Sequence, residues 1–501
     1  MSRQTISPDS LLSPRNYQEW QVPLPYGTAN RSGVEWSLES RSVGIGDRKA
    51  ALALAMLSSF ITPFMVSSIN VALPSIKDEF SMSTVEYSWV AMSYLLAAAA
   101  LLVPFGRYAD IKGRKKIFLT GMWLFAGASV LCALAPSATL LISFRFLQGF
   151  GGAMIFGTSI AILTSVYPPQ ERGKALGLTV SVTYLGLTAG PVLGGFLTGW
   201  VGWRSIFVSV LPGVAVVLWI GTVRLKGEWA EACGEEFDLK GSVIYAGSLT
   251  AVIVGLTMLP DMLGVIISSL GALGVAAFVL LELKVKSPVL NTTLFTRNRS
   301  FAFSNLAALI NYSATFAVTF LMGIYLIIMR DFGEGETGLI FASQTIVMAA
   351  FSPIAGKLSD VVEPQIVASV GMGVSTLGLV LISLVDLTTD VLIIVADFAV
   401  LGFGFALFSS PNTNAIMGSV ERKQYGVASA TVGTMRLVGQ VLSIGIATIF
   451  LSLYLGDIDI TRAAAPQFMN VHTVAFGTFA LMCFVGIFAS LARGKLRKPA
   501  S

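Results

Sequence analysis

The sequence predicts an all-α polytopic membrane protein that crosses the bilayer with fourteen helices. Of its 501 residues, 54% are apolar and 12% are charged, whereas a soluble domain carries about 25% charged residues. Apolar segments of roughly 20 residues, the length a helix needs to cross a bilayer, recur along the chain. Three short motifs are repeated at offsets of 250 to 253 residues, which predicts two duplicated halves.

The first 48 residues differ from the rest because they are polar and contain no apolar run. A secretory signal peptide would need its apolar core much closer to Met1. We therefore expect residues 1–48 to be a mostly disordered cytoplasmic tail, and residues 494–501 to form a second, short cytoplasmic tail.

Fourteen apolar segments follow the first tail. The expected spans are residues 50–73, 87–106, 117–135, 138–166, 174–198, 204–223, 241–259, 262–282, 302–327, 335–355, 365–385, 389–410, 424–453 and 472–492. An even number of spans puts both chain ends on the same side. Lysine and arginine concentrate in the loops after even-numbered spans, and the other loops are poor in them. Since basic loops stay in the cytoplasm, we expect cytoplasmic termini and a location in the plasma membrane.

The repeat sets the expected domain organisation. Gly356–Asp360 repeats Gly106–Asp110, with a glycine, a base and an aspartate in register. The offset is long for a six-helix unit, so we interpret spans 7 and 8 as an inserted pair. We expect a six-helix bundle over residues 49–225, a linker with two inserted central helices over residues 226–285, and a second six-helix bundle over residues 286–493.

A basic stretch, Gly106–Lys116, separates spans 2 and 3. Its first residue permits close packing where span 2 ends, and Gly113 permits a tight turn. Asp110 and Arg114 are four residues apart, so they can pair if the segment is helical. The residue order resembles the signature loop between helices 2 and 3 of the major facilitator superfamily. This resemblance implies that the loop and its repeat, Gly356–Asp360, latch an outward-open state.

An arginine lies inside span 4, where the chain reads from Arg145 to Gly152. A charge within a span costs on the order of 2.5–3.5 kcal/mol, so Arg145 should face the bundle interior or a cavity. The stretch resembles the span-4 motif of proton-coupled facilitators, in which the arginine is associated with proton transfer. The alternative is that Arg145 only donates to backbone carbonyls of a broken helix.

Span 5 carries small residues at a helical spacing. Gly186, Gly190 and Gly194 lie on one face and permit close helix packing, and Pro191 should bend the span. The stretch resembles the antiporter motif of drug/proton antiporters. Three further features point to the same group: the number of spans, Asn70–Pro74 at the end of span 1, and a Trp-Arg-Ser-Ile-Phe motif at span 6. With these features, the chain resembles the fourteen-span drug/proton antiporter family over about residues 50–492.

One position departs from that family. Met65 stands five residues before Asn70, where the family usually has an aspartate associated with proton coupling and cation recognition. Asp397 in span 12 and Arg436 in span 13 lie at a similar expected depth. Our hypothesis is that these two residues form an intramembrane ion pair that opens when Asp397 is protonated. The alternative is a permanent pair that only fixes the packing.

Other polar or aromatic residues within or near the spans are candidates for a substrate cavity between the bundles. Each of them is also consistent with an ordinary hydrogen bond between helices. The candidates are Asn70, Trp89, Tyr94, Gln148, Asn311, Gln344, Asn412, Asn414 and Gln440.

The resemblance implies a secondary active transporter that works by alternating access. We expect proton-driven efflux of small organic amphiphiles, drugs or metabolites, by a monomer that uses the proton gradient and no cofactor. Because span 1 lacks its acid, neutral and anionic compounds agree with the sequence as well as cationic drugs. Two alternatives remain open. One is a uniporter or importer of a specific solute, and the other is a sensor or scaffold that has lost transport.

Other classes of function are not expected. The sequence has no P-loop and no catalytic cluster, so we do not expect an enzyme. The three cysteines lack metal-ligand spacing and His472 is the single histidine, so we expect no metal site. The bases flank apolar spans, which argues against nucleic-acid binding.

Overall fold

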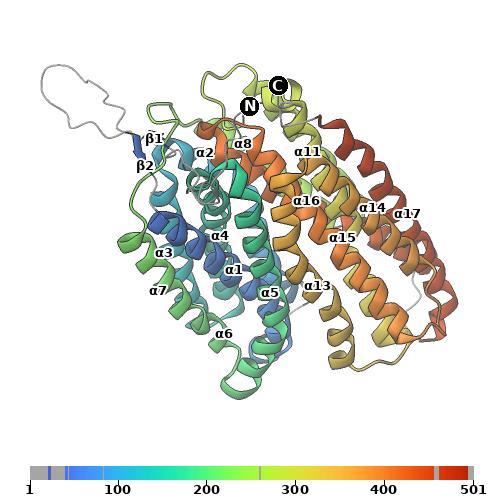
Figure 1. Cartoon of the computed structure of the whole chain (residues 1–501). Coiled ribbons are helices and arrows are strands. Elements are labelled where there is room, and N and C mark those ends of the chain that lie inside the picture. Colours follow the sequence, from blue (N-terminus) through green and yellow to red (C-terminus); the bar gives the residue numbers. More distant parts are fainter. Residues whose placement is uncertain are drawn as a thin grey trace, which may run out of the picture.

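The computed structural model describes residues 21–23, 40–42, 45–82, 84–258, 261–290, 292–455 and 462–494, which are almost entirely helical (Figure 1). Most of the predicted first tail and residues 495–501 of the second lie outside the described residues. Within the first tail, the strands β1 (Gln21–Pro23) and β2 (Ser40–Ser42) pair antiparallel. The first helix begins at Ile45, slightly before the expected boundary.

Fourteen helical segments of the described chain are long and apolar enough to cross a membrane, which confirms the predicted number. Seven helices and a π-helical turn form the first six spans, because α6, α7 and η2 share one span. They are α1 (Ile45–Phe80), α2 (Thr84–Lys112), α3 (Arg114–Ala133), α4 (Ala138–Val166), α5 (Pro169–Val201), α6 (Arg204–Ser209), α7 (Leu211–Trp219) and η2 (Ile220–Arg224).

Two helices follow the first bundle, α8 (Leu239–Thr257) and α9 (Met262–Glu282). The remaining elements form the last six spans and their short connecting turns. They are α10 (Thr293–Thr296), α11 (Arg299–Thr315), α12 (Ala317–Ile324), η3 (Tyr325–Met329), α13 (Glu334–Val361), α14 (Pro364–Ser383), α15 (Val391–Gly418), η4 (Arg422–Gln424), α16 (Tyr425–Leu455), η5 (Arg462–Ala464) and α17 (Ala465–Ala492).

The helices form two bundles, each with its own apolar core. In Figure 1 the blue and green helices α1–α7 lie beside the yellow to red helices α11–α17. Phe118 and Phe207 belong to the first core, and Phe398 and Phe476 belong to the second. The inserted helices α8 and α9 pack against each other, and α8 also contacts α2 and α16. This is the arrangement that the resemblance to the major facilitator superfamily implies, with a central helix pair added.

We call the end of the molecule where α1 begins and α17 ends the basic end, because lysines and arginines concentrate at its turns. The turns between α2 and α3, α4 and α5, and α15 and α16 lie there. The other end, where α1 ends and α17 begins, is called the opposite end.

The structure corrects the expected loop at Gly106–Lys116. α2 continues to Lys112 and α3 begins at Arg114, so that only Gly113, with φ of +112°, breaks the helix. The repeat Gly356–Asp360 lies entirely inside α13. The expected loops began where the apolar runs ended, but a helix keeps its backbone hydrogen bonds beyond the apolar core and can therefore extend past it.

Candidate transport cavity and the contacts that close it

A cavity of about 390 Å³ lies between the two bundles. α1, α2, α4 and α5 line it from the first bundle, and α11–α13, α15 and α16 line it from the second. Tyr94, Gln344 and Gln440, which the sequence singled out, belong to the wall, together with the rings of Tyr184 and Phe405. An aromatic wall with a few polar groups suits a small organic molecule.

Among the residues that the structure describes, Arg436 is the one charged residue on the cavity wall. Its guanidinium carbon lies over the ring of Phe156, 5.2 Å from the ring centre, so a cation of the second bundle faces an aromatic ring of the first. No aspartate or glutamate of the described chain lines this cavity. The wall therefore attracts a negative group more than a positive one.

Asp397 does not pair with Arg436 in this structure, contrary to the hypothesis drawn from the sequence. Asp397 on α15 is 4% exposed, and its Oδ2 atom has no hydrogen-bond partner within the described part of the chain. One turn later on the same face, Leu401 packs against Gly378 of α14. This face of α15 therefore points into the second bundle, whereas Arg436 points into the cavity. Similar depth along two helices does not bring side chains together when they face different neighbours.

Arg145 is buried in the first bundle, one layer behind the cavity wall. Its Nε donates to the carbonyl oxygen of Val90 at 3.1 Å, and its Nη1 donates to Gln148 at 2.6 Å. Its guanidinium also lies over the ring of Tyr94, 4.8 Å from the ring centre. The contact with a backbone carbonyl agrees with the alternative in which Arg145 has only a structural role. The helix that supplies this carbonyl is not broken, however, because α2 is continuous at Val90. The contact with Tyr94 links Arg145 to the cavity.

Several predicted cavity residues lie elsewhere. Gln148 and Asn311 are buried inside their own bundles, where Gln148 donates to a serine of α3 and Asn311 donates to a cysteine of α17. Asn412 and Asn414 donate to oxygen atoms on α11 and α13. Asn70 is exposed on α1, and Trp89 is half-buried against the core beside α8. These spans satisfy their polar groups mainly through contacts between helices.

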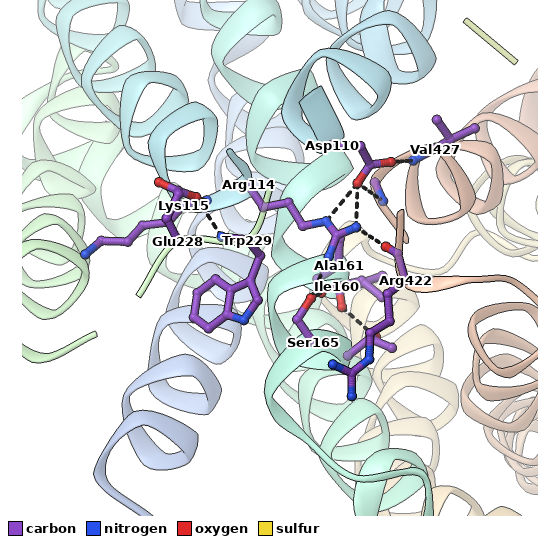
Figure 2. Close-up of polar contacts among 12 residues, drawn as sticks. Asp110, Arg114, Lys115, Ile160, Ala161, Ser165, Glu228, Trp229, Arg422 and Val427 are labelled. Atoms are coloured by element: carbon purple, nitrogen blue, oxygen red, sulfur yellow. Dashed lines mark hydrogen bonds and ion pairs between the residues drawn. The ribbon is translucent and has the colours of Figure 1, made fainter. Parts of the chain in front are cut away.

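Asp110 closes the basic end from the first bundle (Figure 2). Its carboxylate accepts hydrogen bonds from the backbone nitrogens of Gly426 at 2.9 Å and Val427 at 3.1 Å, in the first turn of α16. Nε of Arg114 donates to the same carboxylate at 2.8 Å, which confirms the pair predicted from their spacing. A carboxylate at a helix N-terminus is stabilised by the free N–H groups and by the helix dipole.

Arg114 extends this contact into a cluster. It donates to the hydroxyl of Ser165 at 2.7 Å and to the carbonyl oxygen of Arg422 (Figure 2). It also lies over the ring of Tyr425, 5.3 Å from the ring centre, and Arg172 lies over the same ring at 5.4 Å. The first residue of α16 is thereby held by two arginines of the first bundle, an arrangement that aromatic rings favour.

Asp360 closes the basic end from the second bundle. Its carboxylate accepts hydrogen bonds from the backbone nitrogens of Gly173 at 2.7 Å and Lys174 at 2.8 Å, in the second turn of α5. Asn414 lies 3.5 Å away and donates to the same carboxylate. The second helix of each bundle thus gives an aspartate to the fifth helix of the other. The two predicted latch segments therefore do join the bundles.

Glycines let these helices cross closely. A Cβ atom at Gly106 would lie 2.5 Å from the carbonyl oxygen of Gly426, and one at Gly173 would meet the carbonyl oxygen of Gly356. Both contacts would be closer than the contacts that real Cβ atoms make. The two crossings lie beside the two aspartate contacts, so any side chain at these glycines would push the bundles apart.

The glycine face of α5 packs closely against another helix, as the sequence predicts, and the structure identifies that helix as α1. A Cβ atom at Gly186 would lie 2.6 Å from a backbone oxygen of α1, and one at Gly194 would lie 2.8 Å from Cβ of Ser68. Ser68 also donates to the carbonyl oxygen of Gly190 at 3.1 Å. α5 continues as one helix through Pro191. This face therefore holds the first bundle together on one side of the cavity.

The sequence profile of the Major Facilitator Superfamily matches residues 55–304 and 305–501 of the chain. The chain belongs to the major facilitator superfamily. This family and the relatives described next consist of transporters, so this facilitator is a membrane transporter and not an enzyme.

Known proteins resemble this facilitator over most of its length. It is 25% identical over 439 residues to the riboflavin transporter RibZ of Clostridioides difficile, and the aligned region covers 87% of this chain and 95% of that protein. It is 29% identical over 414 residues to the multidrug resistance protein Stp of Mycobacterium tuberculosis, and the aligned region covers 81% of this chain and 75% of that protein. Its fold is similar to the crystal structure of the human organic anion transporter MFSD10 (TETRAN), with a TM-score of 0.63 and 12% identity over 88% of this chain and 99% of that chain.

The linker of this facilitator, residues 226–238, holds contacts that sequence reasoning missed. The carboxylate of Glu228 accepts a hydrogen bond from the backbone nitrogen of Lys115 at 2.8 Å (Figure 2). It accepts a second one from the backbone nitrogen of Lys116 at 3.1 Å. It therefore caps α3, whose preceding residue, Gly113, has no side chain to do so. Burial raises the pKa of Glu228. The only signal in the sequence is Trp229, an aromatic residue in a charged linker, which the structure buries.

Tyr425 is the second functional residue that sequence reasoning missed. It follows a charged turn and begins an apolar run, so the sequence marks it only as a helix start. Its role depends on Arg114 and Arg172, which are far away in the chain. No local pattern could connect these three residues in this facilitator.

Proposed function

We propose that this facilitator works as a monomer that exports small organic amphiphiles in exchange for protons, with its basic end in the cytoplasm. The observation that carries the proposal is the closure of the basic end by Asp110 and Asp360, next to a cavity between the bundles. Because loops rich in lysine and arginine remain in the cytoplasm of a plasma membrane, this conformation faces outward. Opening both contacts would present the same cavity to the cytoplasm.

The cargo that suits the cavity best is a neutral or anionic amphiphile. Arg436 supplies the one formal charge on the wall, and the aromatic rings supply apolar area. Met65, which stands where the fourteen-span drug/proton antiporters usually have an aspartate, is buried in the core of the first bundle. A cationic cargo would therefore find no carboxylate partner on this wall.

The relatives support two kinds of cargo. The name of Stp, a multidrug resistance protein, supports export of drug-like compounds. The name of RibZ, a riboflavin transporter, supports a second candidate function, the uptake or facilitated passage of one specific aromatic metabolite. The tyrosine and phenylalanine rings of the cavity favour a planar aromatic group under either function.

Asp397 is the proposed site of the coupling proton. The other carboxylates of the described spans, such as Glu336 and Asp360, lie within two residues of a span end, whereas Asp397 lies six residues inside the span that begins at Val391. An ionisable residue this deep in a span marks a functional site by default, and proton relays use such acids. Arg145 and Arg436 supply the positive charge beside and within the cavity.

The test is transport by the purified full-length chain in proteoliposomes with an imposed pH gradient. The panel contains cationic, neutral and anionic amphiphiles that share one aromatic body, and a pH-sensitive dye reports proton movement. We expect proton movement with the neutral or anionic members. Asp397→Asn should abolish it, and Asp78→Asn, at an exposed position of the opposite end, should leave it unchanged.

Three other outcomes contradict the proposal. Normal proton-driven transport by Asp397→Asn would remove the coupling role from that residue. Movement of a labelled compound without any proton flux in the unaltered chain would favour a uniporter. An unaltered chain that moves no member of the panel would favour a sensor or scaffold.

A further inference from the structure

A second cavity, of about 380 Å³, lies at the basic end. α2 contributes Arg107, the segment after α9 contributes Lys286, and the turn before α16 contributes Lys423. The linker contributes the one acid on the wall, Glu235. Three bases and one acid leave an excess of positive charge on this wall, and they come from four separate parts of the chain.

Arg107 is the buried member of this group, with 6% of its surface exposed. One of its terminal nitrogens forms an ion pair with Glu235, but its Nε has no hydrogen-bond partner in the described chain. Buried N–H groups of charged side chains are nearly always satisfied. The ion pair with Glu235 therefore satisfies only part of this guanidinium, and the Arg107 side chain forms part of the cavity wall.

The remaining groups on the wall add further donors. Lys286 is exposed, and Ser287 and Gln424 bring a hydroxyl and an amide to the same cavity. Lys423 also pairs at 2.9 Å with Glu421, which does not line the cavity. Arginine, lysine and uncharged donors that converge from several directions match the several acceptor oxygens of a phosphate group.

We propose that this cavity binds a phosphate group, either on a lipid headgroup or as free phosphate, and that the bound group holds the basic end closed. Arg107 lies three residues before Asp110 on α2, and Lys423 lies three residues before Gly426 of α16. A phosphate that contacts both bases bridges the two bundles beside the first aspartate contact. Rocking the bundles apart separates these bases, so binding favours the closed state.

A natural cysteine close to this cavity can be labelled with a fluorescent dye. Cys233 is exposed in the linker, two residues from Glu235, whereas Cys132 and Cys483 are buried. A maleimide dye should therefore label Cys233 selectively. The labelled full-length chain in an uncharged detergent is titrated with inorganic phosphate against sodium chloride of the same ionic strength. A second arm titrates phosphatidic acid against phosphatidylcholine, and both arms also record the melting temperature.

We expect a saturable change in fluorescence and a rise in melting temperature with one phosphate source. A response to inorganic phosphate identifies a soluble ligand, and a response to phosphatidic acid alone identifies a lipid headgroup. Lys286→Gln should weaken the apparent affinity about tenfold, as the loss of one charge-assisted contact predicts. The matched control is Lys284→Gln, two residues earlier, which is exposed and outside the cavity wall. It should bind as the unaltered chain does.

Three results would overturn the site. The first is an equal response to sodium chloride, which would mean that ionic strength alone causes the change in fluorescence. The second is an equal loss of affinity in both lysine variants. The third is the absence of any response to either phosphate source. Both lysines are exposed, so neither change endangers the fold. The assay measures binding without transport, so its result is independent of the proposed export.

Discussion

Asp110 and Asp360 make similar contacts in opposite directions, each with two backbone nitrogens near the start of the fifth helix of the other bundle. Their surroundings differ. Four residues after Asp110 stands Arg114, which is fully buried against it, and four residues after Asp360 stands Pro364. The first closure therefore contains a buried ion pair built within its own segment, whereas an uncharged proline stands at the matching position of the second.

The two closures should respond differently to the same substitution. Asp110→Asn leaves the buried guanidinium of Arg114 without its carboxylate, which costs on the order of 3–5 kcal/mol of folding stability. Asp360→Asn weakens charge-assisted hydrogen bonds to backbone nitrogens, which costs about 1.5–3 kcal/mol. Thermal unfolding of both variants in detergent measures the difference. Equal losses would show that the ion pair of the first closure adds no stability.

Gly106→Ala should hold the bundles apart at the basic end. The new methyl group meets the carbonyl oxygen of Gly426 at 2.5 Å, and overpacking of this kind typically costs about 1–3 kcal/mol. Ser429, which donates to the carbonyl oxygen of Phe156 across this interface, becomes accessible. With the exposed Cys233 replaced by serine, Ser429→Cys should therefore react faster with a membrane-impermeant thiol reagent in the Gly106→Ala background.

The matched control for that experiment is Gly127→Ala in α3, where no atom lies within 4 Å of the added methyl group. Alanine stabilises a helix by about 1 kcal/mol relative to glycine, so this variant should be at least as stable as the unaltered chain. Faster labelling in both alanine variants would mean that the effect is not specific to the crossing of α2 and α16.

Arg436 should set the charge preference of the cavity. Arg436→Gln removes the one charge on the wall and should reduce transport of an anionic amphiphile about tenfold or more, since a charge-assisted contact contributes about 1.5–3 kcal/mol. A neutral analogue with the same aromatic body should be transported almost as before. Arg436→Lys keeps the charge and should retain the preference. Equal losses for both compounds in Arg436→Gln would indicate a structural role instead.

The opposite end contains a contact that should depend on pH. Arg204 and Trp203 donate to the carboxylate of Glu79, each at 2.7 Å. The hydrogen bond from Arg204 lowers the pKa of Glu79. Because the lowered value belongs to the folded state, the contact contributes stability above the unfolded pKa of about 4.5, and this contribution is lost as the pH falls through the folded value.

Glu79→Gln should therefore lower the stability at pH 7 by about 0.5–1 kcal/mol, the upper range for an exposed ion pair. The difference from the unaltered chain should shrink below about pH 4.5. Thermal unfolding as a function of pH measures this. Asp78→Asn, at the exposed neighbouring position, serves as the control and should show no such convergence. A deficit that stays constant at acid pH would exclude the ion pair as its cause.

Much of the fold could be predicted because membrane spans leave a strong signal in the sequence. The number of spans follows from the apolar runs, and the Asp110–Arg114 pair follows from a four-residue spacing. The cavity wall was harder to predict. Gln148 and Asn412 look like Gln344 and Gln440 in sequence, because apolar residues surround all four and hide which helix face points inward. The first two lie inside their bundles, and the last two line the cavity.

Contacts between distant segments could not be predicted at all. Glu228 caps α3 across 113 residues of chain, and Asp110 reaches Gly426 across 316. Asp397 and Arg436 failed to meet because their helices turn these residues toward different neighbours. Local spacing predicts partners within one helix, and only the packing of whole helices determines the others.

The exchange of aspartates between the bundles is self-complementary under a two-fold rotation, as in a symmetric homodimer. Two copies of one ancestral six-helix unit that carried this aspartate and the receiving glycine would satisfy both contacts at once. A fusion of two such copies would keep an interface that already existed in the dimer. Because α8 and α9 leave from the basic end and return to it, such a pair can be added between the two halves without inverting the second half.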